Sequence, residues 1–188
     1  MRGKIDVAFM RPEATAPDLV YKVVTKEPLV AILPSDHRLA GYKAIEPHDI
    51  AGETFISVSN TAPTLRVVID DYLERLNLGI KPDHEVDNHA MAMSLVASTR
   101  GVAFLPAYAQ NLLPWSVISR PLKGDAPTID LVIGYHRANA SPTLKLFLSR
   151  LDEMIARVST KFSGAVDGRM EDRQMHVEEP GDSVHLRP

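Results

Sequence analysis

Apolar residues along the chain are grouped in short runs, each bounded by proline, glycine or a polar segment. This pattern is typical of buried strands, whose flanking segments turn the chain. The predicted strands are residues 5–10, 19–25, 29–33, 55–58, 84–86, 102–105, 117–122 and 129–135.

Two segments repeat apolar residues at helical spacing. The first stripe consists of Leu65, Val68, Ile69, Tyr72, Leu73 and Leu76. It predicts a helix with Pro63 in its first turn and Gly79 as the residue that ends it. The second stripe consists of Leu144, Phe147, Leu148, Leu151, Ile155 and Val158, in a helix opened by Ser141 and Pro142.

Two shorter helices are expected between these stripes. Asn88 is a suitable N-cap for a helix that runs to about Ser98 and is broken by Gly101. Residues 107–113 form a short helix that Pro114 ends. Strands and helices therefore alternate through most of residues 5–158, which predicts an α/β protein with mainly parallel sheets.

In such sheets, small ligands bind at the carboxyl ends of strands, beside helix N-termini. The polar turns Ser59–Thr61 and Asp87–His89 both follow predicted strands. The free N–H groups at the start of the helix after Thr61 suit a carboxylate or another small anion. An ordinary helix cap uses the same residue types, so the turn alone leaves both interpretations open.

Composition narrows the possible functions. The 188 residues are 45% hydrophobic, which fits one domain or two small lobes with a real core. The absence of cysteine excludes a disulfide scaffold, cysteine-ligated zinc, an iron–sulfur centre and a thiol nucleophile. A net charge of −3 without a Lys/Arg cluster gives no sign of a DNA-binding surface. We find neither an apolar membrane span nor the apolar core of a signal peptide.

No pattern of catalytic or metal-binding residues is visible. The seven histidines have no ligand spacing; His84 and His89 are separated by a strand end, and structural or solvent roles are favoured. Neither a Gly-x-Ser-x-Gly elbow nor a phosphate-binding glycine loop occurs. We therefore predict no cofactor, no metal and no enzyme activity.

Several segments, taken in order, resemble the LysR-type transcriptional regulators. They are Ile5-Asp-Val-Ala-Phe-Met-Arg11, residues 26–40 (KEPLVAILPSDHRLA), residues 50–56 (IAGETFI), Asp87-Asn88, residues 94–97 (SLVA), residues 101–106 (GVAFLP) and Ser141-Pro142. The resemblance covers residues 3 to about 158 and identifies the chain as a member of that family, in its C-terminal effector-binding domain.

The resemblance implies a two-lobed, periplasmic-binding-protein-like fold whose lobes are joined by crossing strands near Thr25–Leu29 and Ile129–Gly134. Residues 1–26 would belong to lobe I, 27–130 to lobe II, and 131–158 would return to lobe I with the closing helix. Residues 159–188 are charged and poor in apolar residues, which indicates a largely disordered tail.

The family also implies partners. A small organic acid would bind between the lobes and shift their relative orientation, and the intact regulator would form a homodimer or tetramer in the cytoplasm. DNA would be bound only through a helix-turn-helix that this sequence lacks, and no membrane would be involved. A stand-alone small-molecule-binding module, or an α/β enzyme, is the alternative.

By position, the resemblance assigns one wall of the effector pocket to Ser59, Asn60, Thr61 and Ala62, with an added hydroxyl or cap from Thr64. Asn88 is a cap that could also face the ligand. An apolar floor would come from Phe104, Leu105 and Pro106, although core packing is favoured for Phe104. Arg11 would pair with an effector carboxylate or remain a solvated arginine at a strand end.

The sequence begins at what looks like a later strand of lobe I, so we expect lobe I to be incomplete and the chain to be a truncated fragment. An incomplete lobe should expose apolar surface and an unpaired strand edge, which favours aggregation or strand exchange. Without the helix-turn-helix, the fragment should not bind operator DNA selectively.

Overall fold

The computed structural model describes residues 5–12 and 16–155 of the chain. It divides into two units, Met1–Asn139 and Ala140–Pro188. The predicted tail from residue 159 and Val158 of the second stripe lie outside the described residues. Within the described part, no helix is long and apolar enough to cross a membrane.

The described residues of the first unit form strands, two α-helices and three short 3₁₀ helices. The strands are β1 (Ala8–Met10), β2 (Leu19–Pro34), β3 (Phe55–Val58), β4 (His84–Val86), β5 (Val102–Pro106), β6 (Val117–Pro121) and β7 (Thr128–His136). The helices are η1 (Arg38–Gly41), η2 (Pro47–Ile50), α1 (Pro63–Arg75), α2 (His89–Thr99) and η3 (Ala107–Leu112). The strand order is β1-β7-β2-β5-β3-β4, and β6 pairs with β2. The α/β prediction is confirmed.

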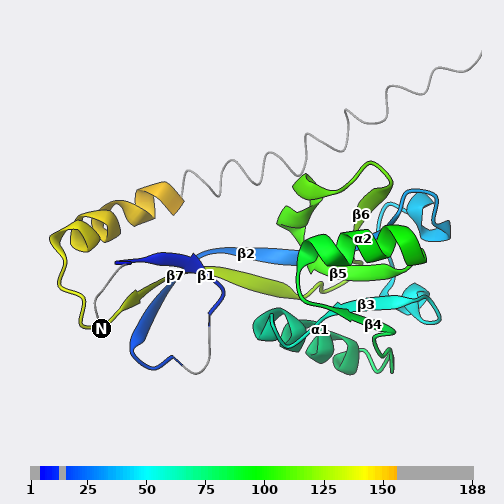
Figure 1. Ribbon diagram of the computed structural model, residues 1–188, viewed down its shortest axis with the longest axis horizontal. Coiled ribbons are helices and arrows are strands. Elements are labelled where there is room, and N and C mark those ends of the chain that lie inside the picture. Colours follow the sequence, from blue (N-terminus) through cyan, green and yellow to red (C-terminus); the bar gives the residue numbers. More distant parts are fainter. Residues whose placement is uncertain (1–4, 13–15, 156–188) are drawn as a thin grey trace, which may run out of the picture. The chain divides into compact units, whose positions relative to one another are not determined.

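Two long strands, β2 and β7, run side by side through the unit (Figure 1). The first part of β2 pairs with β7, and its last part pairs with β5 and β6. Residues 19–25 and 29–33 were predicted as separate strands, but they are one strand. Lys26, Glu27 and Pro28 continue the pairing with β7 instead of turning, and the only irregularity in this pairing lies between Val23 and Thr25.

The prediction of mainly parallel sheets needs correction. Among the described pairs of named strands, only β3–β4 and β3–β5 are parallel, and the others are antiparallel. Parallel neighbours need a crossover connection, which α1 and α2 provide between β3, β4 and β5. The sheet is therefore mixed, and the parallel part is where helix N-termini meet strand ends.

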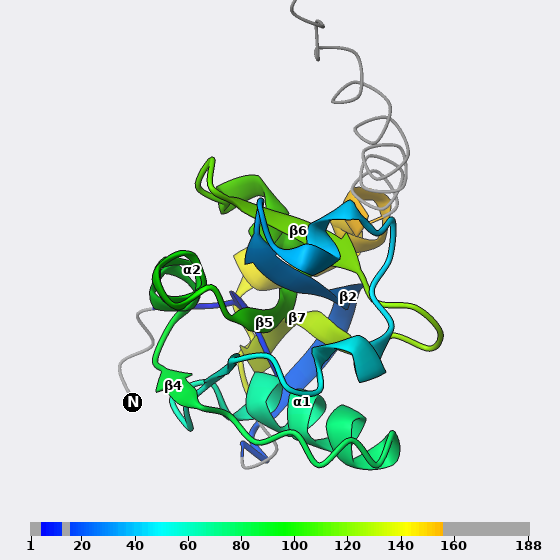
Figure 2. The same ribbon diagram turned by 90° about the vertical axis from the view of Figure 1, so that its right-hand side faces the viewer.

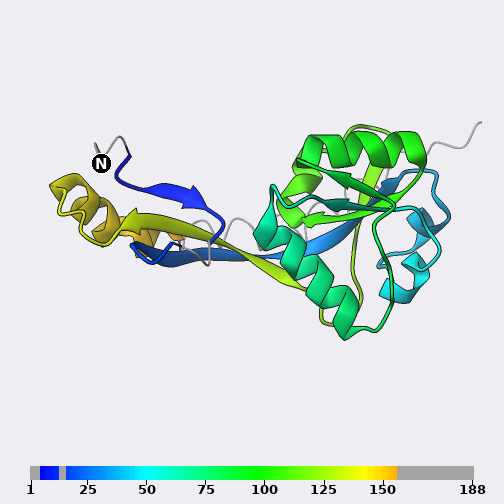
Figure 3. The same ribbon diagram turned by 60° about the horizontal axis from the view of Figure 1, so that its bottom comes forward.

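α1 and α2 cover opposite faces of the sheet around β3 and β5 (Figures 2 and 3). Along β5, Phe104 belongs to the core under α1, whereas Leu105 belongs to the core under α2. This alternation follows from the two-residue period of a strand. In the α1 stripe, Leu65, Ile69, Tyr72 and Leu73 are buried, and Val68 and Leu76 are partly buried against the same core. The predicted stripe is confirmed.

The helix starts agree with the sequence, but one helix end does not. α1 begins at Pro63, and the Asn88 side chain accepts the N–H of Met91 at 2.9 Å to cap α2. Gly79 was predicted to end α1, yet Asn77 takes the left-handed conformation there, with φ of 52°. The N–H of Leu78 then reaches back to the carbonyl of Leu73 at 3.2 Å, closing the helix end two residues before Gly79.

In the second unit, residues 142–155 are helical. The N–H of Leu144 lies 3.5 Å from the Ser141 hydroxyl, and the N–H of Lys145 donates to the Ser141 carbonyl at 3.1 Å. Ser141 and Pro142 therefore open this helix as the sequence predicts.

Candidate functional site

The polar turn after β3 is bound to the turn after β4. The Ser59 hydroxyl donates to the Asp87 carboxylate at 2.6 Å, and the Thr61 hydroxyl donates to the Asp87 carbonyl at 3.1 Å. The backbone N–H of Ser59 donates to the carbonyl of Val86 at 2.8 Å. Because β3 and β4 are parallel neighbours, their carboxyl ends meet at one edge, as the sequence led us to expect.

These bonds limit what the turn can offer a ligand. The Ser59 and Thr61 hydroxyl protons already point at Asp87, so an anion would have to displace a carboxylate or a carbonyl to receive them. Asn60 is exposed, and Ala62, the residue before α1, is half-buried. Their backbone and side-chain positions are compatible with a ligand wall, and that role stays a prediction.

The start of α1 retains hydrogen-bond donors. Ala62 provides no side-chain cap, Pro63 has no N–H, and the first helical bond is that of Arg66 to the Ala62 carbonyl at 3.0 Å. Within the described residues, we find no acceptor for the N–H groups of Thr64 and Leu65. A helix N-terminus with two open donors is suited to an anionic oxygen.

The Thr64 hydroxyl does not cap α1. It donates to the carbonyl of Pro12 at 2.9 Å and so ties α1 to the segment that follows β1. This contact joins residues far apart in the sequence and places Arg11, which precedes Pro12, beside the same edge of the sheet.

Arg11 is engaged by neighbouring groups. Its guanidinium forms an ion pair with Glu27 of β2, and the two side chains are only 25% and 15% exposed. The guanidinium also lies 5.9 Å from the centre of the Tyr108 ring. Arg11 is thus a partly buried, paired cation, and an effector carboxylate would compete with Glu27 for it.

The tyrosine that Arg11 contacts is paired with a histidine. The Tyr108 hydroxyl lies 2.5 Å from Nδ1 of His89, and the two rings meet edge to face at 5.6 Å. Burial, aided by the charge of Arg11, lowers the pKa of His89, while burial raises the pKa of Tyr108. Both side chains are therefore uncharged at neutral pH.

Together with the chain from Thr61 to Thr64 and from Asp87 to His89, these contacts form a closed circuit of linked residues at one end of the parallel strands. We call this set the carboxyl-end cluster; it comprises Arg11, Pro12, Glu27, Ser59, Thr61, Thr64, Asp87, His89 and Tyr108. Of the residues singled out in the sequence, Arg11, Ser59, Thr61 and Thr64 are in it. Asn88 lies in the chain between Asp87 and His89, where its side chain caps α2.

The expected apolar floor consists of core residues. Phe104 is 1% exposed and packs edge to face against Phe55 at 5.3 Å and Tyr72 at 6.1 Å. Leu105 and Pro106 are also buried. The core-packing interpretation of Phe104 is confirmed, and a ligand contact from any of the three stays a prediction.

Glu27 and Tyr108 were not singled out in the sequence. His89, although it lies in the predicted polar turn Asp87–His89, was assigned a structural or solvent role. Tyr108 follows the end of β5 and His89 follows the cap of α2, so the rule that selected Ser59 also selects them. Glu27 had no such signal, because its position depends on residues 26–28 continuing β2.

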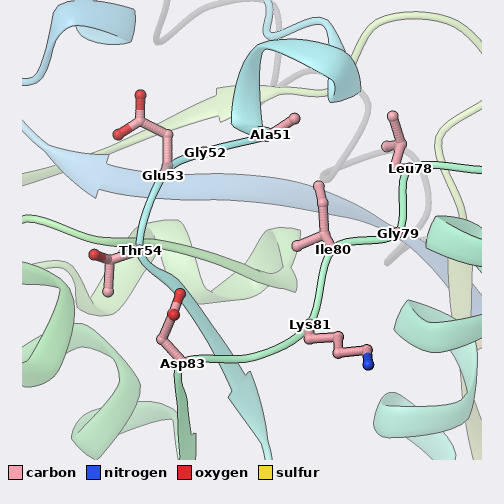
Figure 4. Close-up of a pocket in the computed structure, with 9 residues that line it drawn as sticks. All are labelled: Ala51, Gly52, Glu53, Thr54, Leu78, Gly79, Ile80, Lys81 and Asp83. Carbon is pink, nitrogen blue, oxygen red and sulfur yellow. The ribbon is translucent and has the colours of Figure 1, made fainter.

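A separate hollow lies at the other end of β3 (Figure 4). It has a volume of about 350 Å³ and is lined by Ala51, Gly52, Glu53, Thr54, Leu78, Gly79, Ile80, Lys81 and Asp83. Its two carboxylates already have partners: Glu53 binds His37 and Arg38, and Asp83 accepts the N–H of Phe55 at 2.8 Å. The hollow therefore offers a ligand Lys81 and backbone groups, and no set of converging side chains.

Among the described residues, no group of histidine, aspartate and glutamate side chains is arranged to hold a metal ion. The ionisable groups of the carboxyl-end cluster are instead neutralised or bonded to one another. The chemistry that this arrangement supports is recognition by hydrogen bonds.

Comparison with known proteins identifies the family. The family model described as LysR substrate binding domain matches residues 1–156. The Hca operon transcriptional activator HcaR of Escherichia coli (strain K12) is 30% identical over 159 residues, which cover 84% of this chain and 54% of that protein. The HTH-type transcriptional regulator AlsR of Bacillus subtilis (strain 168) is 27% identical over 151 residues, covering 79% and 49%. This chain belongs to the LysR substrate-binding domain family, and it spans about half the length of these curated relatives.

Solved structures share the fold. The effector-binding domain of QuiR in complex with shikimate superposes with a TM-score of 0.68 at 22% identity, covering 84% of this chain and 73% of that one. The BenM effector-binding domain with benzoate gives 0.69 at 19% identity, covering 98% and 77%. The expected family and the periplasmic-binding-protein-like α/β class are confirmed. The family domain is regulatory, not catalytic, and the relatives are named as transcriptional regulators.

Proposed function

We propose that this chain is the effector-sensing part of a LysR-type transcriptional regulator and that it binds a small organic acid at the carboxyl-end cluster. The observation that carries the proposal is the set of contacts that links four elements (β2, α1, α2 and η3), the turns after β3 and β4, and the segment after β1. This set lies at the edge where an α/β sheet binds ligands.

The acid is proposed from the open donors of α1. The N–H groups of Thr64 and Leu65 point out of a helix start that has neither a side-chain cap nor a further N–H at Pro63. A carboxylate gains from both the donors and the helix dipole. The structures of QuiR with shikimate and of BenM with benzoate each hold a carboxylate compound, which supports the same class here.

The acid would shift the equilibrium between two arrangements of the segment after β1, α1 and η3, which meet at the carboxyl-end cluster. The Thr64–Pro12 and Arg11–Tyr108 contacts join the segment after β1 to α1 and η3, so a ligand among them alters how these parts meet. A coupling of about 1–3 kcal/mol suffices for a useful switch. In an intact regulator, acting in the cytoplasm as a homodimer or tetramer, this shift would move the attached DNA-binding domains.

The test is a titration of the 188-residue chain with benzoate and with shikimate, followed by calorimetry and by amide chemical shifts in NMR spectra. We expect saturable binding of at least one acid, with the largest shifts at Asn60, Thr64, Leu65 and Tyr108. Benzamide, which has the shape of benzoate without its charge, is the control and should bind at least about tenfold more weakly. Saturable shifts confined to the hollow around Lys81 would contradict the proposed site.

A further inference from the structure

We propose that the His89–Tyr108 pair is the specificity element of this site and that it binds a hydroxyl group on the effector. With Glu27 and Asp87 it restricts the effector to a monocarboxylic acid that carries a hydroxyl and rejects dicarboxylic acids. This inference rests on the proposed function, because it assigns the class of acid that the same site accepts.

Contacts and chain neighbours link the pair to the start of α1, where the carboxylate is proposed to bind. His89 is the first residue of α2 and follows directly after the turn that holds Ser59 and Thr61 through Asp87. Tyr108 lies in η3 at the end of β5 and is covered by the guanidinium of Arg11. Arg11 is followed by Pro12, whose carbonyl accepts the Thr64 hydroxyl at the start of α1. The pair and the open donors of α1 therefore belong to one circuit.

The hydrogen-bonding capacity of the pair matches a hydroxyl. Tyr108 can donate to Nδ1 of His89, which leaves Nε2–H of the imidazole as a donor. Alternatively, Nδ1–H can donate to the Tyr108 oxygen, which leaves Nε2 as an acceptor and the phenol O–H as a donor. A ligand hydroxyl both donates and accepts, so it can use every free position of either arrangement, whereas a carboxylate, which only accepts, cannot use the Nε2 acceptor of the second.

The neighbouring charges disfavour a second carboxylate. Arg11 is the one cation of the carboxyl-end cluster, and Glu27 already neutralises it. Asp87 contributes a further negative charge, which faces the Ser59 hydroxyl. A ligand with two carboxylates would bring its second charge to a group of residues whose own formal charge is negative. Such like-charge contact is unfavourable in a partly desolvated site.

Calorimetric titration of the full chain with four probes tests the inference: benzoate, 3-hydroxybenzoate, 4-hydroxybenzoate and terephthalate. We expect one hydroxybenzoate to bind about five- to tenfold more tightly than benzoate, the gain of one well-placed hydrogen bond. Terephthalate should bind at least about tenfold more weakly than benzoate.

Two variants separate the roles of the residues. In Tyr108→Phe the ratio of hydroxybenzoate to benzoate affinity should fall to about one, while Tyr42→Phe, which alters an exposed tyrosine, should keep the wild-type ratio. In Glu27→Gln, the affinity for terephthalate should rise about tenfold relative to the affinity for benzoate. Glu74→Gln, on the exposed face of α1, is the control and should leave this ratio unchanged. Thermal melts verify folding, and His89→Leu replaces Tyr108→Phe if the latter does not fold.

Each outcome decides a separate point. If benzoate binds but neither hydroxybenzoate binds more tightly, or if Tyr108→Phe keeps the preference, the specificity role is overturned and the proposed function stands. If terephthalate binds wild type as tightly as benzoate, the exclusion of dicarboxylic acids is overturned. If none of the four probes binds, both the inference and the proposed acid-binding function fail.

Discussion

The two ends of β3 differ in what surrounds them. At the carboxyl end, side chains from distant parts of the chain meet and bond to one another. At the amino end, the hollow of about 350 Å³ has space but is lined largely by loop residues, and both of its carboxylates are already paired (Figure 4). The comparison shows that convergence of polar groups, more than volume, distinguishes a recognition site in this fold.

Two aspartates on either side of β4 illustrate the difference. Asp83, before β4, accepts the backbone N–H of Phe55 at 2.8 Å and so fixes the start of β3. Asp87, after β4, accepts the Ser59 hydroxyl at 2.6 Å and holds the polar turn. The same residue type therefore fastens the backbone at one end and orients side chains at the other.

The largest effect should come from the core beneath both ends. Phe104→Ala removes the ring that packs against Phe55 and Tyr72, and should lower the free energy of unfolding by about 3–5 kcal/mol. Leu112→Ala, at a 63% exposed residue, is the matched control and should change it by less than about 0.5 kcal/mol. Urea denaturation followed by circular dichroism measures both. A small loss in Phe104→Ala would mean that this residue is available to line a ligand site.

A second test concerns packing at the amino end. A Cβ at Gly101 would lie 2.6 Å from the carbonyl oxygen of Thr54, so Gly101→Ala should destabilise the protein by about 1–3 kcal/mol. Gly41, where a Cβ meets nothing within 4 Å, provides the control Gly41→Ala. Equal melting temperatures of the two variants would show that β3 and β5 are free to separate at this end.

A third test removes one hydrogen bond of the carboxyl-end cluster. Thr64→Val keeps the side-chain shape but removes the hydroxyl that donates to Pro12, and should cost about 1 kcal/mol of stability. It should also weaken acid binding, because the segment that carries Arg11 is no longer held at α1. Thr128→Val, at an exposed position of β7, is the control. Unchanged affinity in Thr64→Val would separate the segment after β1 from the proposed site.

These contrasts also show what the sequence could predict. Period-two alternation places Phe104 and Leu105 on opposite faces, and the cap at Asn88 fixes the start of α2, because both depend on local pattern. The pairing of Ser59 with Asp87 follows from two strand ends that meet at one edge.

The contacts missed in the sequence depend on strand continuity and on distant neighbours. Residues 26–28 look like a break, yet pairing with β7 keeps them extended and sets Glu27 beside Arg11. The end of α1 was also predicted wrongly: Asn77, and not Gly79, takes the left-handed conformation that ends the helix, because asparagine also tolerates this region.

A smaller effect should appear in the pH dependence of stability. Burial lowers the pKa of His89 below its unfolded value of about 6.5, so the folded state binds fewer protons than the unfolded state in acid. The stability that depends on uncharged His89 is present above the unfolded pKa of about 6.5 and is lost as the pH falls through the folded pKa. His89→Gln should flatten the fall in stability between about pH 7 and pH 5, whereas His48→Gln, at an exposed residue, should not. An unchanged slope in His89→Gln would place the imidazole in solvent.

The smallest effect is expected at the hollow. Lys81→Ala removes the cation that lines it without breaking any hydrogen bond found among the described residues. Stability should stay within about 0.5 kcal/mol of wild type, and benzoate affinity should stay within about twofold. Because the two ends of β3 are separated by the length of the strand, a change of charge at the amino end is largely screened at the other. If Lys81→Ala lost benzoate binding while Thr64→Val kept it, the anion site would be the hollow and not the carboxyl-end cluster.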